Sequence, residues 1–271
     1  MTTNKKILFT DMDGTLLRDD ATISDFTRET IRKMTDAGHK FVLSSGRSLA
    51  NIIETKEKLG LNMPGIYISA TNGTLIYECD TQKIIFESRL SMDDVKKIWP
   101  VAIADNIHIQ TYTDHDLIVP KHDRETDYYL IKSNHPVIES EQPWNILDKP
   151  PVKMLCIDLD DHNRIEAWGN NISKQFPHLT VCFSNPMYLE IFSGKAGKGN
   201  SLIWLCNYLN IPVSNSYGAG DEANDISMIQ AAGTGLAMCN GNPEIFKFAD
   251  KIIKINNNSD GLSQYIVNEI L

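Results

Sequence analysis

Residues 6–15 read KILFTDMDGT, and this stretch decides how the rest of the chain is interpreted. The run from Lys5 to Thr10 is short and mainly apolar, and it stops at an acidic turn that contains Gly14. Such a pattern predicts a buried strand that ends in a loop. In an open α/β sheet, ligands bind beyond the carboxyl ends of the strands, so this loop lies where an active site is expected.

The stretches that follow alternate between helix and strand patterns. The sequence predicts, in order, a helix over 23–37, a strand over 41–44, a helix over 49–59 and a strand over 65–68. Strands that alternate with helices imply a parallel sheet covered by helices on both faces. The beginning of the chain is therefore predicted to belong to the α/β class.

The middle third of the chain is richer in hairpins. Strand patterns occur at 74–77, 83–87, 107–112, 117–120, 152–159 and 180–183, with a helix at 164–176 and a turn through Asp114-His115-Asp116. After residue 193 the alternation returns, with strands ending at Tyr217 and Met238 and helices at 202–209, 223–232 and 262–270. The economical organisation is one α/β core made of residues 1–81 and 193–271, with an inserted α+β domain over residues 82–192.

The composition excludes several classes of protein. The 271 residues include 26 Lys and Arg against 35 Asp and Glu, a formal net charge of −9, so binding to nucleic acid or an anionic membrane is not expected. Five scattered cysteines without a CxxC pair indicate free thiols in a reducing compartment. The N-terminal apolar run is too short for a signal peptide, and no apolar stretch approaches the ~20 residues needed to span a bilayer. We therefore expect a soluble, cytoplasmic protein, and the sequence leaves its oligomeric state unknown.

The acidic loop is the first group of residues suited to chemistry. Asp11 and Asp13 are two positions apart, so in an extended stretch both point to one side. Two close carboxylates repel each other and need a bound cation or a shared proton. Gly14 permits the sharp turn that brings backbone amides near a ligand. The alternative interpretation is a polar loop that simply ends a strand.

A second group lies at 217–225, which reads YGAGDEAND and follows a predicted strand. On a helix, Asp221, Asn224 and Asp225 stand at i, i+3 and i+4 and share one face. Carboxylate and amide oxygens are ligands that suit Mg²⁺. The alternative is a helix N-terminus whose acids complement its dipole, which explains one Asp well and the set of side chains poorly.

Two further groups could bind phosphate. Ser44-Ser45-Gly46-Arg47 follows a strand and begins a helix, where a hydroxyl and backbone amides form a phosphate cradle. Residues 194–199 read GKAGKG and precede a helix, so Lys195 or Lys198 could place a positive charge on a phosphate. Each group alone is weak evidence of a phosphate site, because Ser-Gly loops and surface lysines are common.

Together the four groups resemble the haloacid-dehalogenase (HAD) superfamily, and most closely its Cof-type phosphatases with the larger, C2-type cap. The resemblance covers nearly the full length of the chain. It rests on DxDGT at 11–15, SGR at 45–47, Asn72-Gly73, KG at 198–199 and GDxxNDxxM at 220–228. It implies a Rossmann-like parallel-sheet core with helices on both faces and an inserted α+β cap domain.

The resemblance also implies a role for each matching residue. Asp11 would be the nucleophile that forms an aspartyl-phosphate, and Asp13 would protonate the leaving oxygen and then activate water. Mg²⁺ would be held by the Asp11 carboxylate, the backbone carbonyl of Asp13 and Asp221. Ser45, Gly46, Arg47, Lys198 and Asn224 would bind the phosphoryl group, and Asp225 would support the metal ligands from behind. Lys198 is favoured over Lys195 because the family's lysine is followed directly by Gly and a helix.

The expected function is that of a Mg²⁺-dependent phosphatase of small phosphorylated metabolites. By resemblance, sugar phosphates are the favoured substrates, with flavin mononucleotide and pyridoxal phosphate as further options. The insert would act as a cap that excludes water and selects the leaving group. A phosphomutase or phosphotransferase of the same superfamily is the alternative enzyme, and a non-catalytic module that binds phosphorylated metabolites is the alternative of a different class.

Overall fold

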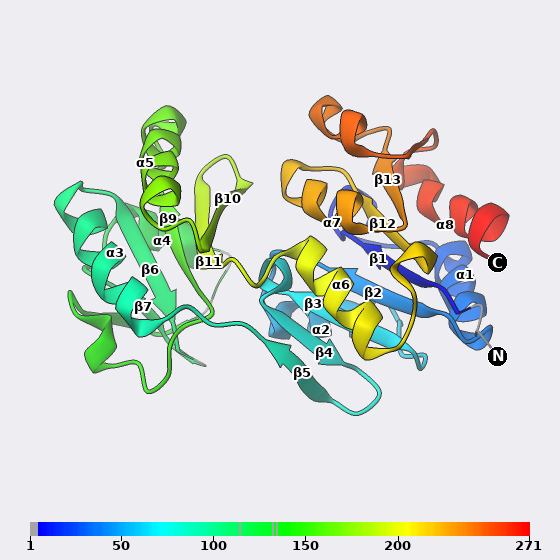
Figure 1. Ribbon diagram of the computed structural model, residues 1–271, viewed down its shortest axis with the longest axis horizontal. Helices are drawn as coiled ribbons and strands as arrows, with labels where there is room; N and C mark the ends of the chain where they lie inside the picture. Colours follow the sequence, from blue (N-terminus) through cyan, green and yellow to red (C-terminus); the bar gives the residue numbers. More distant parts are fainter. Residues whose placement is uncertain (1–4, 114, 132, 134) are drawn as a thin grey trace. The chain divides into compact units, whose positions relative to one another are not determined.

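The computed structural model describes residues 5–113, 115–131, 133 and 135–271, and the chain divides into two compact units (Figure 1). Unit 1 consists of Met1–Glu87 and Ala196–Leu271, and unit 2 of Ser88–Lys195. Both ends of the chain therefore contribute to one unit, with the other inserted between them. The predicted turn through residues 114–116 includes Asp114, which lies outside the described residues.

Unit 1 is built on an eight-stranded sheet. Its strands, in spatial order, are β14 (Lys251–Ile253), β13 (Thr234–Met238), β12 (Ser216–Gly220), β1 (Ile7–Thr10), β2 (Lys40–Ser44), β3 (Ile66–Ala70), β4 (Leu75–Glu78) and β5 (Lys83–Glu87). The strands from β14 to β3 are parallel, whereas β4 and β5 add an antiparallel hairpin at one edge. The predicted first strand thus lies in the interior of the sheet, between β12 and β2.

Helices cover both faces of this sheet. On one face Leu8 packs in a core with residues of α1 (Asp25–Asp36), α2 (Leu49–Lys58) and α8 (Gly261–Tyr265). On the other face Ile7 and Phe9 pack with residues of α6 (Lys198–Tyr208) and α7 (Ile226–Ala231). Because both faces are buried, β1 is apolar at successive positions rather than at alternate ones. The predicted α/β class with a sheet covered on both faces is confirmed.

Serine side chains fix where the first two helices begin. Ser24 caps α1 by accepting a hydrogen bond from the backbone N–H of Thr27, and Ser48 caps α2 in the same way through Asn51. Such caps satisfy backbone donors that the first turn of a helix leaves without partners. The cap at Ser48 starts α2 directly after the Ser45-Gly46-Arg47 loop, and this sets the position of that loop.

The described residues of unit 2 form a six-stranded sheet and three α-helices. Its strands, in spatial order, are β10 (Leu179–Asn185), β11 (Tyr188–Ser193), β9 (Lys153–Ile157), β6 (His108–Tyr112), β7 (Leu117–Val119) and β8 (Val137–Glu139). Helices α3 (Met92–Ala104) and α5 (His162–Gln175) share a separate apolar core with this sheet, whereas α4 (Arg124–Leu130) is a short third helix. The insert is thus an α+β unit with its own core.

The boundaries of the units differ from the predicted ones by a few residues. The prediction ended the first core segment at residue 81, but β5 pairs along β4 and therefore belongs to the sheet of unit 1. The prediction restarted the core at residue 193, but Ser193 ends β11, and the division falls after Lys195. Strand pairing, which connects residues that are distant in sequence, decides both boundaries.

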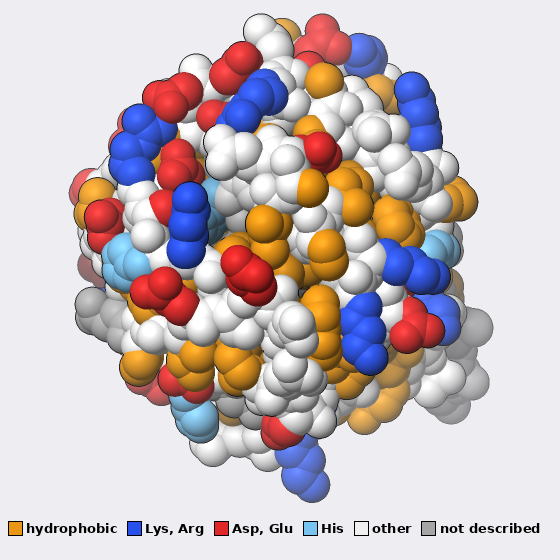
Figure 2. Space-filling model, turned by 90° about the vertical axis from the view of Figure 1, so that its left-hand side faces the viewer, with side chains coloured by type: hydrophobic (Ala, Val, Ile, Leu, Met, Phe, Trp, Pro, Cys, Tyr) orange, Lys and Arg blue, Asp and Glu red, His pale blue; other side chains and the backbone are white. Residues whose placement is uncertain are grey.

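The surface carries charges of both signs. Figure 2 shows one face of the molecule, where hydrophobic side chains gather near the centre and Lys, Arg, Asp and Glu side chains are interspersed around them. On this face no continuous positive surface is available to attract a polyanion. Among the described residues, no helix has the length and hydropathy required to cross a membrane.

Candidate active site

Asp11 lies directly after β1, in the interior of the sheet of unit 1. Its backbone N–H donates to the carbonyl of Ala219 on β12 (2.8 Å), which continues the pairing of the two strands by one residue. Its carboxylate accepts a hydrogen bond from the Nζ of Lys198 (2.6 Å), and the same Nζ donates to Asp225 (2.5 Å). Lys198 is 1% exposed, so the first turn of α6 places an ammonium group inside the protein between two carboxylates.

The charges at this point are not balanced by the protein alone. Oxygens of Asp11, Asp221 and Asp225 lie within 4.8 Å of one another, and all three residues are buried. Burial and the neighbouring carboxylates raise the pKa of Asp11 well above its ordinary value, against the opposite effect of Lys198. Burial, with Asp225 and Glu222, raises the pKa of Asp221 to about 7 although Thr15 opposes the shift. Three buried carboxylates therefore share one ammonium group, an arrangement that favours a further cation.

Lys198 remains a cation despite its burial. Removal from water would lower its pKa, but the charges and hydrogen bonds of Asp11 and Asp225 outweigh that effect and raise it. The alternative lysine, Lys195, is exposed. The contacts therefore support the preference for Lys198 over Lys195 as the cation of this site.

Gly14 and Thr15 shape the position of Asp221. Gly14 has a φ of +77°, and a Cβ added there would lie 2.3 Å from the Oδ2 of Asp221. The hydroxyl of Thr15 donates to the other oxygen, Oδ1, at 2.8 Å. The turn after Asp13 must therefore be glycine both for its backbone conformation and to leave room for a carboxylate that arrives from the far end of the chain.

The prediction that Asp221, Asn224 and Asp225 share one face of a helix is wrong in its geometry. Asp221 follows β12 and precedes the short 3₁₀ helix Ala223–Asp225, so it is not helical. Asp225, which is fully buried, accepts hydrogen bonds through Oδ2 from the backbone N–H groups of Asp221 (3.0 Å) and Glu222 (3.1 Å). Asp225 thus fixes the loop that carries Asp221, because its side chain accepts from backbone N–H groups that the start of a helix leaves without partners.

Ser45 and Gly46 follow β2, at the same edge of the sheet as Asp11. Ser45 is buried, and its hydroxyl accepts a hydrogen bond from the backbone N–H of Arg47 (3.2 Å). A Cβ at Gly46 would lie 3.3 Å from the side-chain Nδ2 of Asn72. The Oδ1 of Asn72 in turn accepts from the Nδ2 of Asn224 (3.3 Å). Gly46, Asn72 and Asn224, which could contact a phosphoryl group, therefore lie next to one another.

Asp13 and Arg47 occupy a different position from the one predicted. The spacing of Asp11 and Asp13 predicts that both point to one side, and the family resemblance implies that Arg47 binds the phosphoryl group. The Asp13 side chain is instead 61% exposed and lies outside the buried carboxylate cluster. The guanidinium of Arg47 donates to both of its oxygens, from Nε (3.0 Å) and from Nη2 (2.5 Å). The chain turns at Asp13 instead of continuing as a strand, so the two carboxylates separate.

Sequence reasoning missed three residues that shape this site. Thr15 and Asn72 stand inside motifs that were recognised, but no role was assigned to their side chains. Asn240 had no sequence signal: its Nδ2 donates to the backbone carbonyl of Gly14 (2.7 Å) and so holds the acidic loop from the turn after β13. Such a contact joins residues 226 positions apart, and only the strand order of the sheet brings them together.

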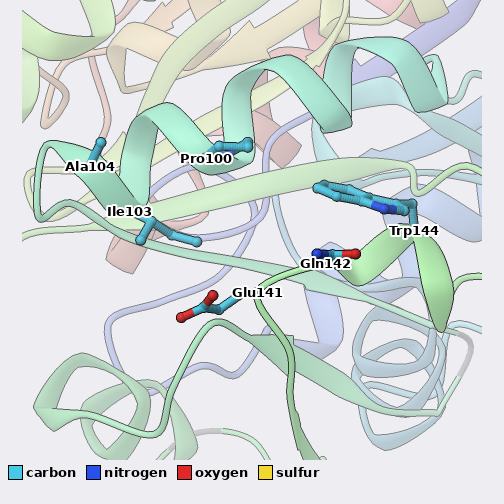
Figure 3. Close-up of a pocket in the computed structure, with 6 residues that line it drawn as sticks. All are labelled: Pro100, Ile103, Ala104, Glu141, Gln142 and Trp144. Atoms are coloured by element: carbon cyan, nitrogen blue, oxygen red, sulfur yellow. The ribbon is translucent and has the colours of Figure 1, made fainter.

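A concave region lies in unit 2. It is an open hollow between α3 and the segment before β9, lined by Pro100, Ile103, Ala104, Glu141, Gln142 and Trp144 (Figure 3). These side chains include one carboxylate and no Lys, Arg or His, so they offer no cation for a phosphate. The chemistry expected from the sequence is therefore concentrated in unit 1.

Comparisons with known proteins agree with this arrangement. The haloacid dehalogenase-like hydrolase family model matches residues 8–266. A relative from Streptococcus pyogenes is 29% identical over 259 residues, which cover 94% of each protein. The 5-amino-6-(5-phospho-D-ribitylamino)uracil phosphatase YwtE of Bacillus subtilis is 27% identical over 287 residues, which cover 96% of each protein. A solved haloacid dehalogenase-like hydrolase from Bacteroides thetaiotaomicron has 25% identity and a TM-score of 0.80, with 97% of this chain and 98% of that chain covered.

The family match spans both segments of unit 1 and the insert between them. The motifs that carried the resemblance meet at the carboxyl ends of β1, β2 and β12, around one buried lysine. Taken with the relatives named as phosphatases, this match means that the chain belongs to the haloacid dehalogenase-like hydrolases and is a phosphatase of that family.

Proposed function

We propose that the protein is a Mg²⁺-dependent phosphatase of small phosphorylated metabolites that acts through an aspartyl-phosphate at Asp11. The observation that carries the proposal is the Asp11 carboxylate, held 2.6 Å from the buried ammonium of Lys198 at the carboxyl end of β1. A carboxylate in this position is oriented and its charge is partly offset, as a nucleophile toward a phosphate dianion requires.

The donor set fits a magnesium ion. Hard oxygen ligands are available from the carboxylates of Asp11 and Asp221 and from the backbone carbonyl of Asp13. The raised pKa values of Asp11 and Asp221 support the view that these carboxylates need a further positive charge beside them, which Mg²⁺ would supply. When bound, Mg²⁺ would offset the negative charge of the phosphoryl oxygens and of the nucleophile.

The first half of the reaction transfers the phosphoryl group to the protein. A carboxylate oxygen of Asp11 attacks phosphorus, and the bond between phosphorus and the leaving oxygen breaks. Asp13 gives its proton to that oxygen, so the product leaves as a neutral alcohol. Lys198, the Ser45 hydroxyl and the Gly46 amide bind the phosphoryl oxygens and stabilise the charge that they carry in the transition state.

The second half regenerates the enzyme. Asp13, now a carboxylate, takes a proton from water as the water oxygen attacks phosphorus. The bond between phosphorus and Asp11 breaks, which releases inorganic phosphate and restores the Asp11 carboxylate. Asn224 and Asn72, joined by a hydrogen bond, support the phosphoryl group from the side of the sheet that carries β3.

For the substrate we favour phosphate monoesters of sugars or polyols. Two Bacillus subtilis relatives, each 27% identical to this chain, are named as phosphatases of 5-amino-6-(5-phospho-D-ribitylamino)uracil, a phosphate ester on a ribityl chain. Flavin mononucleotide carries the same ribityl phosphate, and pyridoxal phosphate is a further compound of suitable size. Unit 2, as an inserted domain, would act as the cap that selects among these leaving groups.

Phosphoryl transfer to a sugar, as in a mutase, is the second candidate. It requires the same aspartyl-phosphate but protects it from water and passes the group to an acceptor hydroxyl. The product would then be a phosphorylated sugar instead of inorganic phosphate.

The test is release of inorganic phosphate from a panel of sugar phosphates, nucleotides, flavin mononucleotide and pyridoxal phosphate, with and without Mg²⁺. We expect metal-dependent release from the wild type and none from Asp11→Asn, which has nearly the same shape but no nucleophilic carboxylate. Release that persists in Asp11→Asn would reject the aspartyl-phosphate. Transfer of phosphate between sugars without release would favour the mutase.

A further inference from the structure

The guanidinium of Arg47 forms a bidentate contact with the carboxylate of Asp13. Its Nε lies 3.0 Å from Oδ2 and its Nη2 lies 2.5 Å from Oδ1. These are the hydrogen bonds of the Asp13 carboxylate among the described residues. A carboxylate that is 61% exposed has several open rotamers, and a bidentate pair restricts it to one of them.

Arg47 is itself fixed from several directions. Its Nη1 lies 3.3 Å from the Oδ1 of Asn51 and 3.4 Å from the Oγ1 of Thr55, which are one turn apart on α2. Its backbone carbonyl accepts from the N–H of Thr71 (3.0 Å), and its backbone N–H donates to the hydroxyl of Ser45 (3.2 Å). Helix α2 and the loops after β2 and β3 therefore hold the guanidinium in place, so Arg47 can hold Asp13.

Most N–H donors of the guanidinium are occupied in this arrangement. Nε serves Asp13, Nη1 faces Asn51 and Thr55, and one N–H of Nη2 serves Asp13 again. A phosphoryl group would find one N–H of Nη2 still open, whereas a bidentate phosphate contact needs two donors side by side. The geometry thus disfavours the role in phosphate binding that the sequence predicted for Arg47.

We propose that Arg47 is a positioning residue for Asp13 and acts on the protonation of the leaving group, not on the binding of phosphate. The inference rests on the proposed function, in which Asp13 donates a proton as the bond between phosphorus and the leaving oxygen breaks. Before this step one oxygen of Asp13 takes a proton from water and gives up its contact with Arg47, while the other oxygen keeps its hydrogen bond from the guanidinium. The proton then moves from the Asp13 carboxyl to the leaving oxygen, and the electron pair of the broken bond stays on that oxygen. A misplaced Asp13 slows the step only for leaving groups that need the proton.

Two substrates distinguish a positioning role of Arg47 from a role in phosphate binding. The 4-nitrophenolate ion leaves without a proton, whereas the alkoxide of a sugar or polyol does not. For Arg47→Ala we expect kcat/KM for the best alkyl phosphate to fall about 10- to 100-fold more than for 4-nitrophenyl phosphate, since general acid catalysis typically contributes on that scale or above. Inhibition by inorganic phosphate should keep the wild-type inhibition constant. The ratio kcat/KM is chosen because it reports the steps up to departure of the leaving group and excludes the later attack by water.

Three further variants define the effect. Arg47→Lys keeps the charge but cannot form the forked contact, so it should retain most of the loss on the alkyl phosphate. Asn51→Ala, which removes one anchor of the guanidinium, should produce a smaller loss in the same direction. Arg32→Ala, an exposed arginine of α1, is the matched control and should behave as the wild type.

The outcomes are distinct. Equal losses of kcat/KM on both substrates with weaker inhibition by phosphate would make Arg47 a phosphate ligand and overturn the proposal, as would wild-type behaviour of Arg47→Ala on both. An unfolded variant would be recognised by its thermal transition, and Asn51→Ala and Arg47→Lys then carry the comparison. Failure of the proposed function would appear earlier, as wild-type protein that releases no phosphate from either substrate or as activity that survives Asp11→Asn.

Discussion

At the scale of single residues, Gly14 meets two requirements at once. Its backbone is left-handed, and the absence of a side chain leaves room for the carboxylate of Asp221. We expect Gly14→Ala to reduce phosphate release by about 100-fold or more, because the new methyl group displaces the Asp221 carboxylate by an ångström or so. The left-handed conformation should also cost about 1–2 kcal/mol of unfolding free energy. Phosphate release and chemical denaturation measure the two effects.

Gly38 provides the matched control. It has a φ of +86°, and a Cβ added there would meet no atom within 4 Å. Gly38→Ala should therefore lose a similar amount of stability and keep its activity. If both variants lose activity alike, backbone strain and not the contact with Asp221 would explain the effect at Gly14.

Lys198 links stability to catalysis. Lys198→Met removes the ammonium that offsets Asp11 and Asp225, which leaves buried carboxylates without their cation. We expect loss of phosphate release and a decrease in unfolding free energy of about 3–5 kcal/mol in the absence of Mg²⁺. Lys195→Ala should change neither quantity. Comparable effects of the two variants would contradict the assignment of the cation.

Much of the site can be predicted at this scale, because the chemistry is carried by short motifs. Asp11, Lys198 and Asp221 lie in recognisable stretches, and the structure brings them together. The sequence could not predict which side chains of a motif are buried and which are exposed. Asp11 is buried, whereas Asp13 turns outward to Arg47. That division depends on the turn at Gly14 and on α2, neither of which is encoded in the spacing of the two carboxylates.

At the scale of elements, helix α4 begins at a carboxylate that titrates unusually. Burial would raise the pKa of Asp123, but the hydrogen bond and charge of His108, with hydrogen bonds from Thr126, lower it from 3.8 to about 2. A lowered pKa in the folded state means that Asp123 stabilises the protein fully above about pH 4, and that this contribution is lost as the pH falls toward about 2. The contribution should be about 1–2 kcal/mol.

The measurement compares wild type with Asp123→Asn, since Asn caps a helix well but does not titrate here. Between about pH 5 and pH 2 the wild type should lose more unfolding free energy than the variant, by the amount given above. Asp127→Asn, on the same helix but with a 73% exposed side chain, is the control and should follow the wild type. Parallel loss in wild type and Asp123→Asn would show that the capping carboxylate contributes nothing to acid stability.

Helices and strands with a clear hydrophobic period could be predicted from the sequence. Strands that form only by pairing with neighbouring strands could not. The strands 41–44 and 83–87 and the helices 23–37 and 49–59 were found within a few residues of their observed bounds. Helix α3 was missed, and it contains Pro100 in its interior, a residue that usually ends a helix. Strands β8 and β14 have three residues each and were missed because so short a run carries almost no pattern; they exist through their neighbours in the sheets.

At the scale of the whole molecule, the two units have separate cores. Ile98 lies in the core of unit 2 and Ile31 in a core of unit 1, and both are fully buried. Each change to Ala should cost about 2–5 kcal/mol locally. In hydrogen exchange, Ile98→Ala should weaken protection mainly within 88–195, and Ile31→Ala mainly in the rest of the described chain. Equal weakening everywhere in both variants would mean that the units unfold as one cooperative block.

The position of β1 also affects how the protein is made. During synthesis β1 leaves the ribosome well before its neighbour β12, residues Ser216–Gly220. Unit 2 ends at Lys195 and is synthesised before β12, so it can begin to fold while β1 still lacks one of its two neighbouring strands. Asp221 follows β12 directly, and a nascent chain therefore has no complete candidate site until β12 and the residue after it have been synthesised. On the proposed function, termination before Asp221 would thus yield fragments that lack a ligand of the metal and release no phosphate, however well their unit 2 folds.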